Sequence, residues 1–319
     1  MSNVTDEVGQ YYAAQSPITA LSGHADLFEG LPCDVDALCG VVQGIIMHHC
    51  LAAARGIELS EERRQEVELR HVPRMLARIL ELDERPLTAE RALDKRLSIN
   101  CRDYSVMLCA MLRHQGIPAR ARAGFARYFG GCPDGEPGFH VDHWVCEYWN
   151  DGDGRWVLVD AEIDEFERDL CSISINPLDV PRDQFLVAGK AWQLCRAGEA
   201  DANRFGLDPD PESEMHGLWY IQSQLVRDLA AMNKMELLCW DCWALGDVGP
   251  NDNVSEEDLS ALDRVAALTQ ADNSAFAELR STYEEDARLR VPPVVNSHTR
   301  AGVRKVHLLG VSRVEGGQE

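Results

Sequence analysis

Apolar residues follow a helical spacing near both ends of the chain and a strand-like alternation in its middle. In residues 35–55 they recur at the interval of a helix face and stop at Gly56. A more charged helical pattern covers residues 60–82, where Pro73 marks a kink or a restart. In residues 97–163 one helical stripe is followed by alternating strands, separated by Gly, Pro, Asn and Asp. A helical block is therefore expected to lead into a mixed α+β unit.

Beyond Pro177 the pattern returns to helical spacing. Helices are expected in residues 183–196, in residues 215–245, and in a stretch that begins at Ser255 and ends before Pro292 and Pro293. Ser255 with Asp258 three residues later is a variant of the capping box that opens helices. Residues 303–311 are expected to add one strand, and the last residues to be loose.

The length of 319 residues suggests more than one packed unit, since about 100–200 residues per domain is usual. The pattern divides the chain into an N-terminal helical block (1–96), an α+β core (97–180) and a C-terminal, mainly helical block (181–319). The fold class is therefore expected to be α+β, with a helix packed on an antiparallel sheet and helical additions on either side.

Composition limits the cellular location and the binding partners that we expect for this chain. Residues 1–10 carry no apolar stretch typical of a signal peptide, and the longest apolar run, residues 41–47, is far short of the roughly 20 residues that span a bilayer. A cytoplasmic location is expected. The net charge of −22 disfavours binding to nucleic acid or to anionic membranes. Because the eleven cysteines are odd in number and irregularly spaced, no disulfide framework is expected and most thiols should be reduced.

One cysteine stands at the start of the central helix. The stripe in residues 100–120 predicts a helix from Cys101 to Gln115, because Gly116 is a typical C-terminal cap and Pro118 prevents continuation. A thiol in the first turn meets free N–H groups and the positive end of the helix dipole, which favour the thiolate. Cys101 is thus a candidate nucleophile. Cys109, deep in the same helix, is interpreted as packing.

A histidine and several acidic residues lie on the two strands that follow. Residues 140–149 and 155–164 alternate as a β-hairpin, with His143 on the first strand. A two-residue turn at Asp151-Gly152 places His143 opposite Asp160. A turn at Asp153-Gly154 places it opposite Asp164, and a four-residue loop places it opposite Glu162. We favour Asp160, although counting alone does not choose among the three registers.

The same segment offers cysteine and histidine residues that resemble a zinc set, namely Cys132, His140, His143 and Cys146. Side chains three residues apart on a strand face opposite sides of it, as His140 and His143 do, and so do His143 and Cys146. Strand spacing therefore argues against a metal site, and no cofactor is expected.

Three motifs together resemble the catalytic core of the transglutaminase-like superfamily: "CRDYSVMLCAMLRHQGIPARARAGFARY", "DHWVCEYW" and "RWVLVDAEID". The resemblance covers residues 97–163 and implies a papain-like arrangement with Cys101 as nucleophile, His143 as base and Asp160 as the group that orients the base. It implies acyl transfer or amide hydrolysis through a thioester. The expected partners are an amide- or ester-containing small molecule or peptide and an amine or water acceptor; the oligomeric state is left open.

Two further interpretations accompany this one. The oxyanion hole is expected to use the backbone N–H of Cys101 and a second donor, for which Asn100 is a guess by proximity, although capping the helix is the favoured role of that residue. The alternative function is a catalytically silent binding module with the same fold. Rapid, selective alkylation of one cysteine by iodoacetamide would favour the enzyme.

Overall fold

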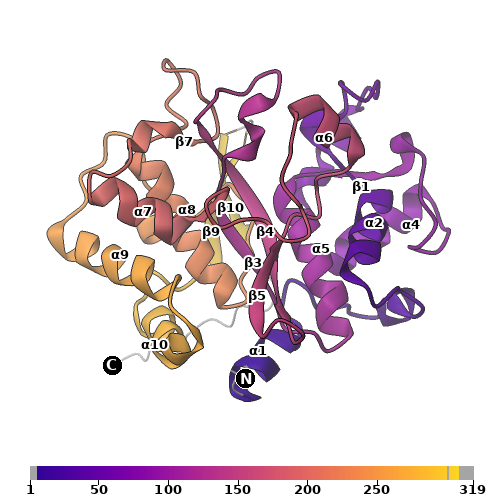
Figure 1. Ribbon diagram of the computed structural model, residues 1–319, viewed down its shortest axis with the longest axis horizontal. Helices are drawn as coiled ribbons and strands as arrows, with labels where there is room; N and C mark the ends of the chain where they lie inside the picture. The colour runs from indigo at the N-terminus through magenta and orange to yellow at the C-terminus, as the bar shows by residue number, and fades with distance from the viewer. Residues whose placement is uncertain (1–5, 300–301, 309–319) are drawn as a thin grey trace.

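The computed structural model describes residues 6–299 and 302–308, and it has a five-stranded sheet at its centre (Figure 1). Four strands pair antiparallel in the order β5-β4-β3-β6, and a short β7 lies parallel to β4. The strands are β3 (Ala119–Ala126), β4 (His140–Asn150), β5 (Arg155–Val159), β6 (Phe185–Val187) and β7 (Phe205–Gly206). The predicted hairpin is therefore present as β4 and β5.

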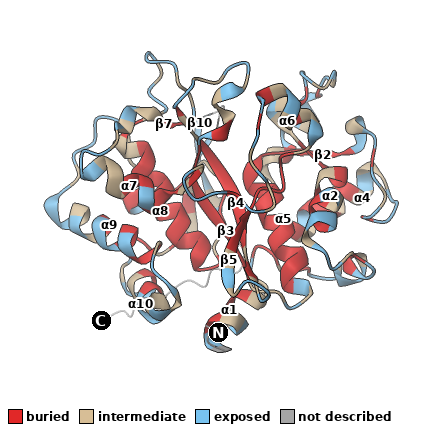
Figure 2. Cartoon of the chain, in the orientation of Figure 1, coloured by how far each residue is buried: buried red, intermediate tan, exposed pale blue. Residues whose placement is uncertain are grey.

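Helices cover both faces of this sheet. The helix α5 (Cys101–His114) packs against β3 and β4, while α7 (Ala188–Arg196) and α8 (Leu218–Met232) pack on β3 from the opposite side (Figure 1). Most residues of α5, α8 and the central strands are buried (Figure 2). The expected α+β class, with the cysteine-bearing helix on an antiparallel sheet, is confirmed.

The N-terminal block differs from its prediction at one place that matters for the site. It contains α1 (Asp6–Ala13), α2 (Val35–Ile45), β1 (Ile46–His48), a 3₁₀ turn η2 (His49–Leu51), α3 (Glu61–Arg64), α4 (Val72–Leu82) and β2 (Leu97–Ile99). The helix expected over 35–55 ends at Ile45, and the next three residues form β1, which pairs in parallel with β2. The buried apolar run there suits a strand as well as a helix. Pro73 lies in the first turn of α4, so it marks a restart.

The core also contains α6 (Glu165–Cys171), and the C-terminal block adds β8 (Asp241–Cys242), α9 (Glu256–Leu268), α10 (Phe276–Glu285), β9 (Val294–Thr299) and β10 (Gly302–His307) to α7 and α8. Ser255 caps α9, since its Oγ accepts the N–H of Asp258 at 3.1 Å, as predicted. The helix expected over 215–245 is shorter, because α8 ends at Met232. The strand expected over 303–311 corresponds to β10, and residues 309–311, like the rest of the terminus, lie outside the described residues.

A single large hydrophobic cluster includes residues of all three blocks, such as Ile18, Met107 and Leu229. The division into three domains stays a prediction. One disulfide joins Cys132 to Cys171, and the other nine cysteines form no disulfide among the described residues. Among the described residues, no helix is long and apolar enough to cross a membrane.

Candidate active site

The start of α5 is fixed by a capping box that follows directly on β2. Asn100 Oδ1 accepts the N–H of Arg102 at 3.0 Å, and Asp103 Oδ2 accepts the N–H of Asn100 at 3.3 Å. The favoured role of Asn100 as the N-cap is confirmed. The box does not use the N–H of Cys101, which begins the helix with 9% of its surface exposed. The side-chain Nδ2 of Asn100 is buried and has no hydrogen-bond partner among the described residues.

His143 and Asp160 are joined by a hydrogen bond of 2.7 Å between Nε2 and Oδ2, and both side chains are buried. The two-residue turn at Asp151-Gly152, from which this pair was predicted, is nevertheless not formed. Asn150 pairs with Arg155, so the loop has four residues, and the count would set His143 opposite Glu162. The strand pairing stops at Val159 before that point. Asp160 then donates its N–H to the carbonyl of Pro177 at 2.8 Å, and its side chain reaches His143 from the end of β5.

The four-residue loop has a local cause that the sequence count did not include. The Asn150 side chain accepts the N–H groups of Gly152 and Asp153 at 2.9 and 3.2 Å, which bends the chain into an Asx turn. Gly154 closes the loop with a φ of +62°, a conformation that glycine adopts without strain.

The Asp160 carboxylate is held from three directions. Oδ2 also accepts the hydroxyl of Tyr128 at 2.7 Å, and Oδ1 accepts the N–H of Glu162 at 3.1 Å. Burial and then the Asp160 charge raise the pKa of Tyr128 well above its usual value, so its hydroxyl remains a donor. The ring of Phe129 meets the imidazole of His143 edge-on, with centroids 4.9 Å apart. These contacts fix both the carboxylate and the imidazole plane.

Cys101 lies in the same neighbourhood, with His48 and Glu162 beside it. A ring nitrogen of His48, the Sγ of Cys101 and a carboxylate oxygen of Glu162 lie within 4.8 Å of one another. The charge of His143 contributes to lowering the pKa of His48, and Cys101 contributes to raising the pKa of Tyr128, whose hydroxyl binds Asp160. The start of α5, the end of β1 and the β4–β5 pair therefore meet at one site.

The thiol of Cys101 is neutral at rest. Its contact with the thiol of Cys239, and then burial, raise its pKa well above the ordinary value, and the nearby carboxylates of Glu162 and Asp142 act in the same direction. The expectation that the helix terminus favours the thiolate is therefore wrong for this site. Any reaction that used this thiol as a nucleophile would need a base to remove its proton.

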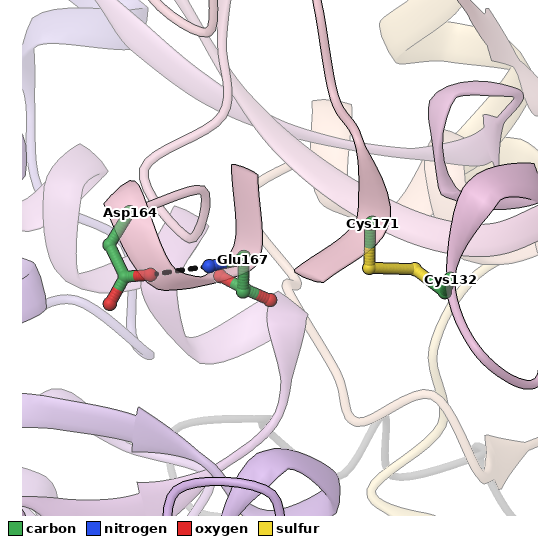
Figure 3. The surroundings of a disulfide bond; sticks show 4 residues. All are labelled: Cys132, Asp164, Glu167 and Cys171. Atoms are coloured by element: carbon green, nitrogen blue, oxygen red, sulfur yellow. Dashed lines mark hydrogen bonds between the residues drawn. A yellow bond between two sulfur atoms is a disulfide. The ribbon is translucent and has the colours of Figure 1, made fainter. Parts of the chain in front are cut away.

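Two further carboxyl groups, those of Glu162 and Glu167, interact with the charge of Asp160. Burial, and then the charge of its neighbour Glu167, raise the pKa of Glu162 well above normal, and burial with the charge of Asp160 raises the pKa of Glu167 to about 8. Glu167 lies on α6, which Asp164 caps by accepting the Glu167 N–H at 2.9 Å, and which the disulfide from Cys171 to Cys132 anchors (Figure 3).

The C-terminal block also reaches the site. Asp142, which precedes His143 on β4, accepts the hydroxyl of Tyr220 at 2.7 Å and the side-chain amide of Gln224, both from α8. Sequence reasoning did not identify Asp142, Gln224, Tyr128, Cys239 or His48 as residues of the site. The signal for His48 was the apolar run of residues 41–47 ending in a histidine, which was interpreted as a continuing helix.

Three of the four residues in the zinc set suggested by the sequence take part in other contacts. In the zinc set considered above, Cys132 is in a disulfide, Cys146 Sγ lies 3.4 Å from Cys109 Sγ, and His143 binds Asp160. His48, Cys101 and Glu162 offer a nitrogen, a sulfur and an oxygen at one place, a donor set that suits zinc.

Comparison with known proteins gives one match. Residues 61–161 match the family model of the transglutaminase-like superfamily, which confirms the resemblance over about a third of the chain, including Cys101, His143 and Asp160. No curated protein and no solved structure matches the chain.

Proposed function

We propose that this protein, whose residues 61–161 match the transglutaminase-like superfamily, is a cysteine-dependent enzyme. It would transfer or hydrolyse acyl groups through a thioester on Cys101. The observation that carries this proposal is the buried 2.7 Å hydrogen bond between His143 and Asp160. It is supported by Cys101 at the start of α5, whose Sγ lies within 4.8 Å of a carboxylate oxygen of Glu162, the residue whose N–H binds Asp160. A nucleophile, a base and an orienting carboxylate are the parts that this chemistry needs.

In the first half of the proposed reaction, the thiol proton of Cys101 moves to His143 and then to the leaving group. Because Nε2 of His143 is bound to Asp160, Nδ1 is the nitrogen left to take the proton from the Cys101 thiol as Sγ attacks the substrate carbonyl carbon. The negative charge that forms on the carbonyl oxygen is met by the free N–H of Cys101. His143 then returns the proton to the departing amine or alcohol, which leaves a thioester.

The second half reverses these roles. An amine or a water molecule attacks the thioester carbon and gives its proton to His143, and Sγ leaves and is reprotonated. Asp160 stabilises the imidazolium in both halves, and Tyr128 keeps the carboxylate in place. The substrate class proposed is a small-molecule or peptide amide or ester, with an amine or water as acceptor and no resident cofactor.

A neutral, largely buried thiol is also what a catalytically silent binding module would have, so this alternative is kept. The two functions differ in one respect. An enzyme holds a base that can remove the thiol proton when a carbonyl is presented, whereas a silent module gains nothing from the His143–Asp160 pair.

The test is acylation by p-nitrophenyl acetate, a small ester that needs no specific pocket. We expect p-nitrophenol release with one acetyl group on Cys101, found by mass spectrometry of peptides, and loss of this acylation in Cys101→Ala with an unchanged melting temperature. The matched control Cys33→Ser removes an exposed thiol and should acylate like the parent protein. Full p-nitrophenol release by Cys101→Ala would reject the enzyme and leave the binding module.

A further inference from the structure

His48 is brought to the nucleophile by the pairing of two short strands. It ends β1 and pairs with Ile99, the last residue of β2, and Cys101 follows Ile99 by two residues. Parallel strands that run in register end at the same edge, so the His48 side chain and the start of α5 lie side by side. The side chain of His48 keeps 17% of its surface exposed, which leaves it accessible to a bound substrate.

The hydrogen bonding of His48 decides which nitrogen carries its proton. Nδ1 accepts the backbone N–H of Cys50 at 3.2 Å, so the neutral ring has its proton on Nε2. Burial, and then the charges of His49 and His143, lower the pKa of His48 well below its usual value, which keeps the ring neutral. Nε2 is 3.8 Å from Oε1 of Glu162, too far for a direct hydrogen bond. The ring therefore presents an N–H group that Glu162 does not occupy.

The separation from the sulfur fits a donor to the reacting oxygen. A carbonyl oxygen on the carbon attacked by Sγ lies within about 3 Å of the sulfur, and an oxyanion donor lies about 2.7–3.1 Å from that oxygen. A ring nitrogen of His48 lies within 4.8 Å of Cys101 Sγ, inside the range that these two distances allow. A neutral imidazole N–H is a suitable donor, since it stabilises the developing charge without itself giving up a proton.

We infer that His48 is the second donor of the oxyanion hole, acting with the backbone N–H of Cys101 on the substrate carbonyl oxygen. This inference rests on the proposed function. It differs from a metal role for the same residues, because a metal at Nε2 requires a lone pair where the Cys50 contact places the proton. It also differs from a role as base, because His143, not His48, is bonded to a carboxylate that can stabilise its charged form.

The experiment compares two reactions of the same thiol. Alkylation by iodoacetamide occurs at a tetrahedral carbon and forms no oxyanion, whereas acylation by p-nitrophenyl acetate does. We expect His48→Ala to slow acylation about 10²–10³-fold, as loss of one oxyanion donor does elsewhere. Alkylation of Cys101 should stay within about threefold of the parent rate, because that reaction has no oxyanion to stabilise. His48→Gln, whose side-chain amide can donate, should recover part of the acylation rate.

The rival donor is the unpartnered Nδ2 of Asn100, and Asn100→Ser tests it, because serine also caps a helix but lacks the amide. A loss of acylation in Asn100→Ser with none in His48→Ala would overturn the inference. Equal losses of alkylation and acylation in His48→Ala would overturn it too, because His48 would then act on the thiol. If Cys101 of the parent protein is alkylated by iodoacetamide but never acylated by p-nitrophenyl acetate, the proposed function fails, and the inference about His48 is rejected with it.

Discussion

The surroundings of Cys101, the proposed nucleophile, and of His143, its proposed base, act in opposite ways. Cys101 is held as a neutral thiol by its contact with Cys239, by burial and by nearby carboxylates, so it carries no charge until a substrate arrives. His143 is held ready by a carboxylate that itself accepts a tyrosine hydroxyl and a backbone N–H. In the proposed reaction, the ion pair between thiolate and imidazolium would therefore form only as Sγ attacks the substrate, and the carboxylate that stabilises the imidazolium would matter most at that moment.

Asp160→Asn tests that role. An amide can still contact His143 but favours the wrong tautomer and cannot stabilise the imidazolium, so acylation should fall by up to about 10⁴-fold, as with the equivalent replacement in a serine triad. The matched control is Asp164→Asn, because asparagine can also cap α6, although the ion pair to Arg55 is lost. Rates of p-nitrophenol release, with melting curves for both variants, provide the measurement. If Asp164→Asn lost as much of the acylation rate as Asp160→Asn, the assignment of the orienting role to Asp160 would be wrong.

At the scale of elements, local signals were sufficient for α5 and insufficient for its neighbours. Its limits follow from a cap, a glycine and a proline within a short stretch, which a reader of the sequence can see. The strand β1 depends on β2, about fifty residues later, and that partner is invisible to a local pattern. The register of β4 and β5 depended on an asparagine side chain folding back on its own loop. The order of the motifs therefore led to the acid that binds His143, while the turn count behind that choice failed.

The disulfide between Cys132 and Cys171 is an element-scale feature connected to the site. It ties α6 to the end of the 3₁₀ turn η5 (Tyr128–Gly131), which supplies the hydroxyl bound to Asp160 and the Phe129 ring against His143. Replacing both Cys132 and Cys171 by Ala should lower the free energy of unfolding by about 2–4 kcal/mol, given the 39-residue separation of the pair. Acylation should also slow, because Tyr128 and Phe129 lose their anchor.

Urea unfolding and p-nitrophenyl acetate kinetics measure the two effects. The control is the double variant Cys33→Ser and Cys195→Ser, which removes two free thiols and should change neither quantity by much. If the alanine pair is as stable and as active as the parent, the disulfide contributes nothing to the site.

Across the whole molecule, buried ion pairs connect the central sheet to the C-terminal helices. Arg122 on β3 binds Asp228 of α8 through two hydrogen bonds of 2.9 and 2.8 Å, and it also contacts Glu147 on β4 at 2.9 Å. Asp228 accepts the backbone N–H of Ala123 as well. Arg122 is thus buried between two acids of a chain whose net charge is −22, and α8, which also binds Asp142, is fixed to the sheet by this network. Sequence patterning found the helical block, but it could not identify the pair of Arg122 with Asp228, because these residues lie 106 positions apart.

Asp228→Ala should show how much the docking of α8 depends on this pair. The substitution leaves the Arg122 guanidinium buried with only Glu147 and a carbonyl oxygen as partners, and breaking one side of a buried pair costs about 3–5 kcal/mol. Glu278→Ala is the matched control, because it removes an acid from an exposed pair with Arg264, where about 0–1 kcal/mol is usual. Urea unfolding at neutral pH measures both. Because α8 also carries Tyr220 and Gln224, which bind Asp142 next to His143, loosening this helix should slow acylation at temperatures where the fold persists. A loss of less than about 1 kcal/mol in Asp228→Ala, matching the surface control, would mean that apolar packing alone holds α8 on the sheet.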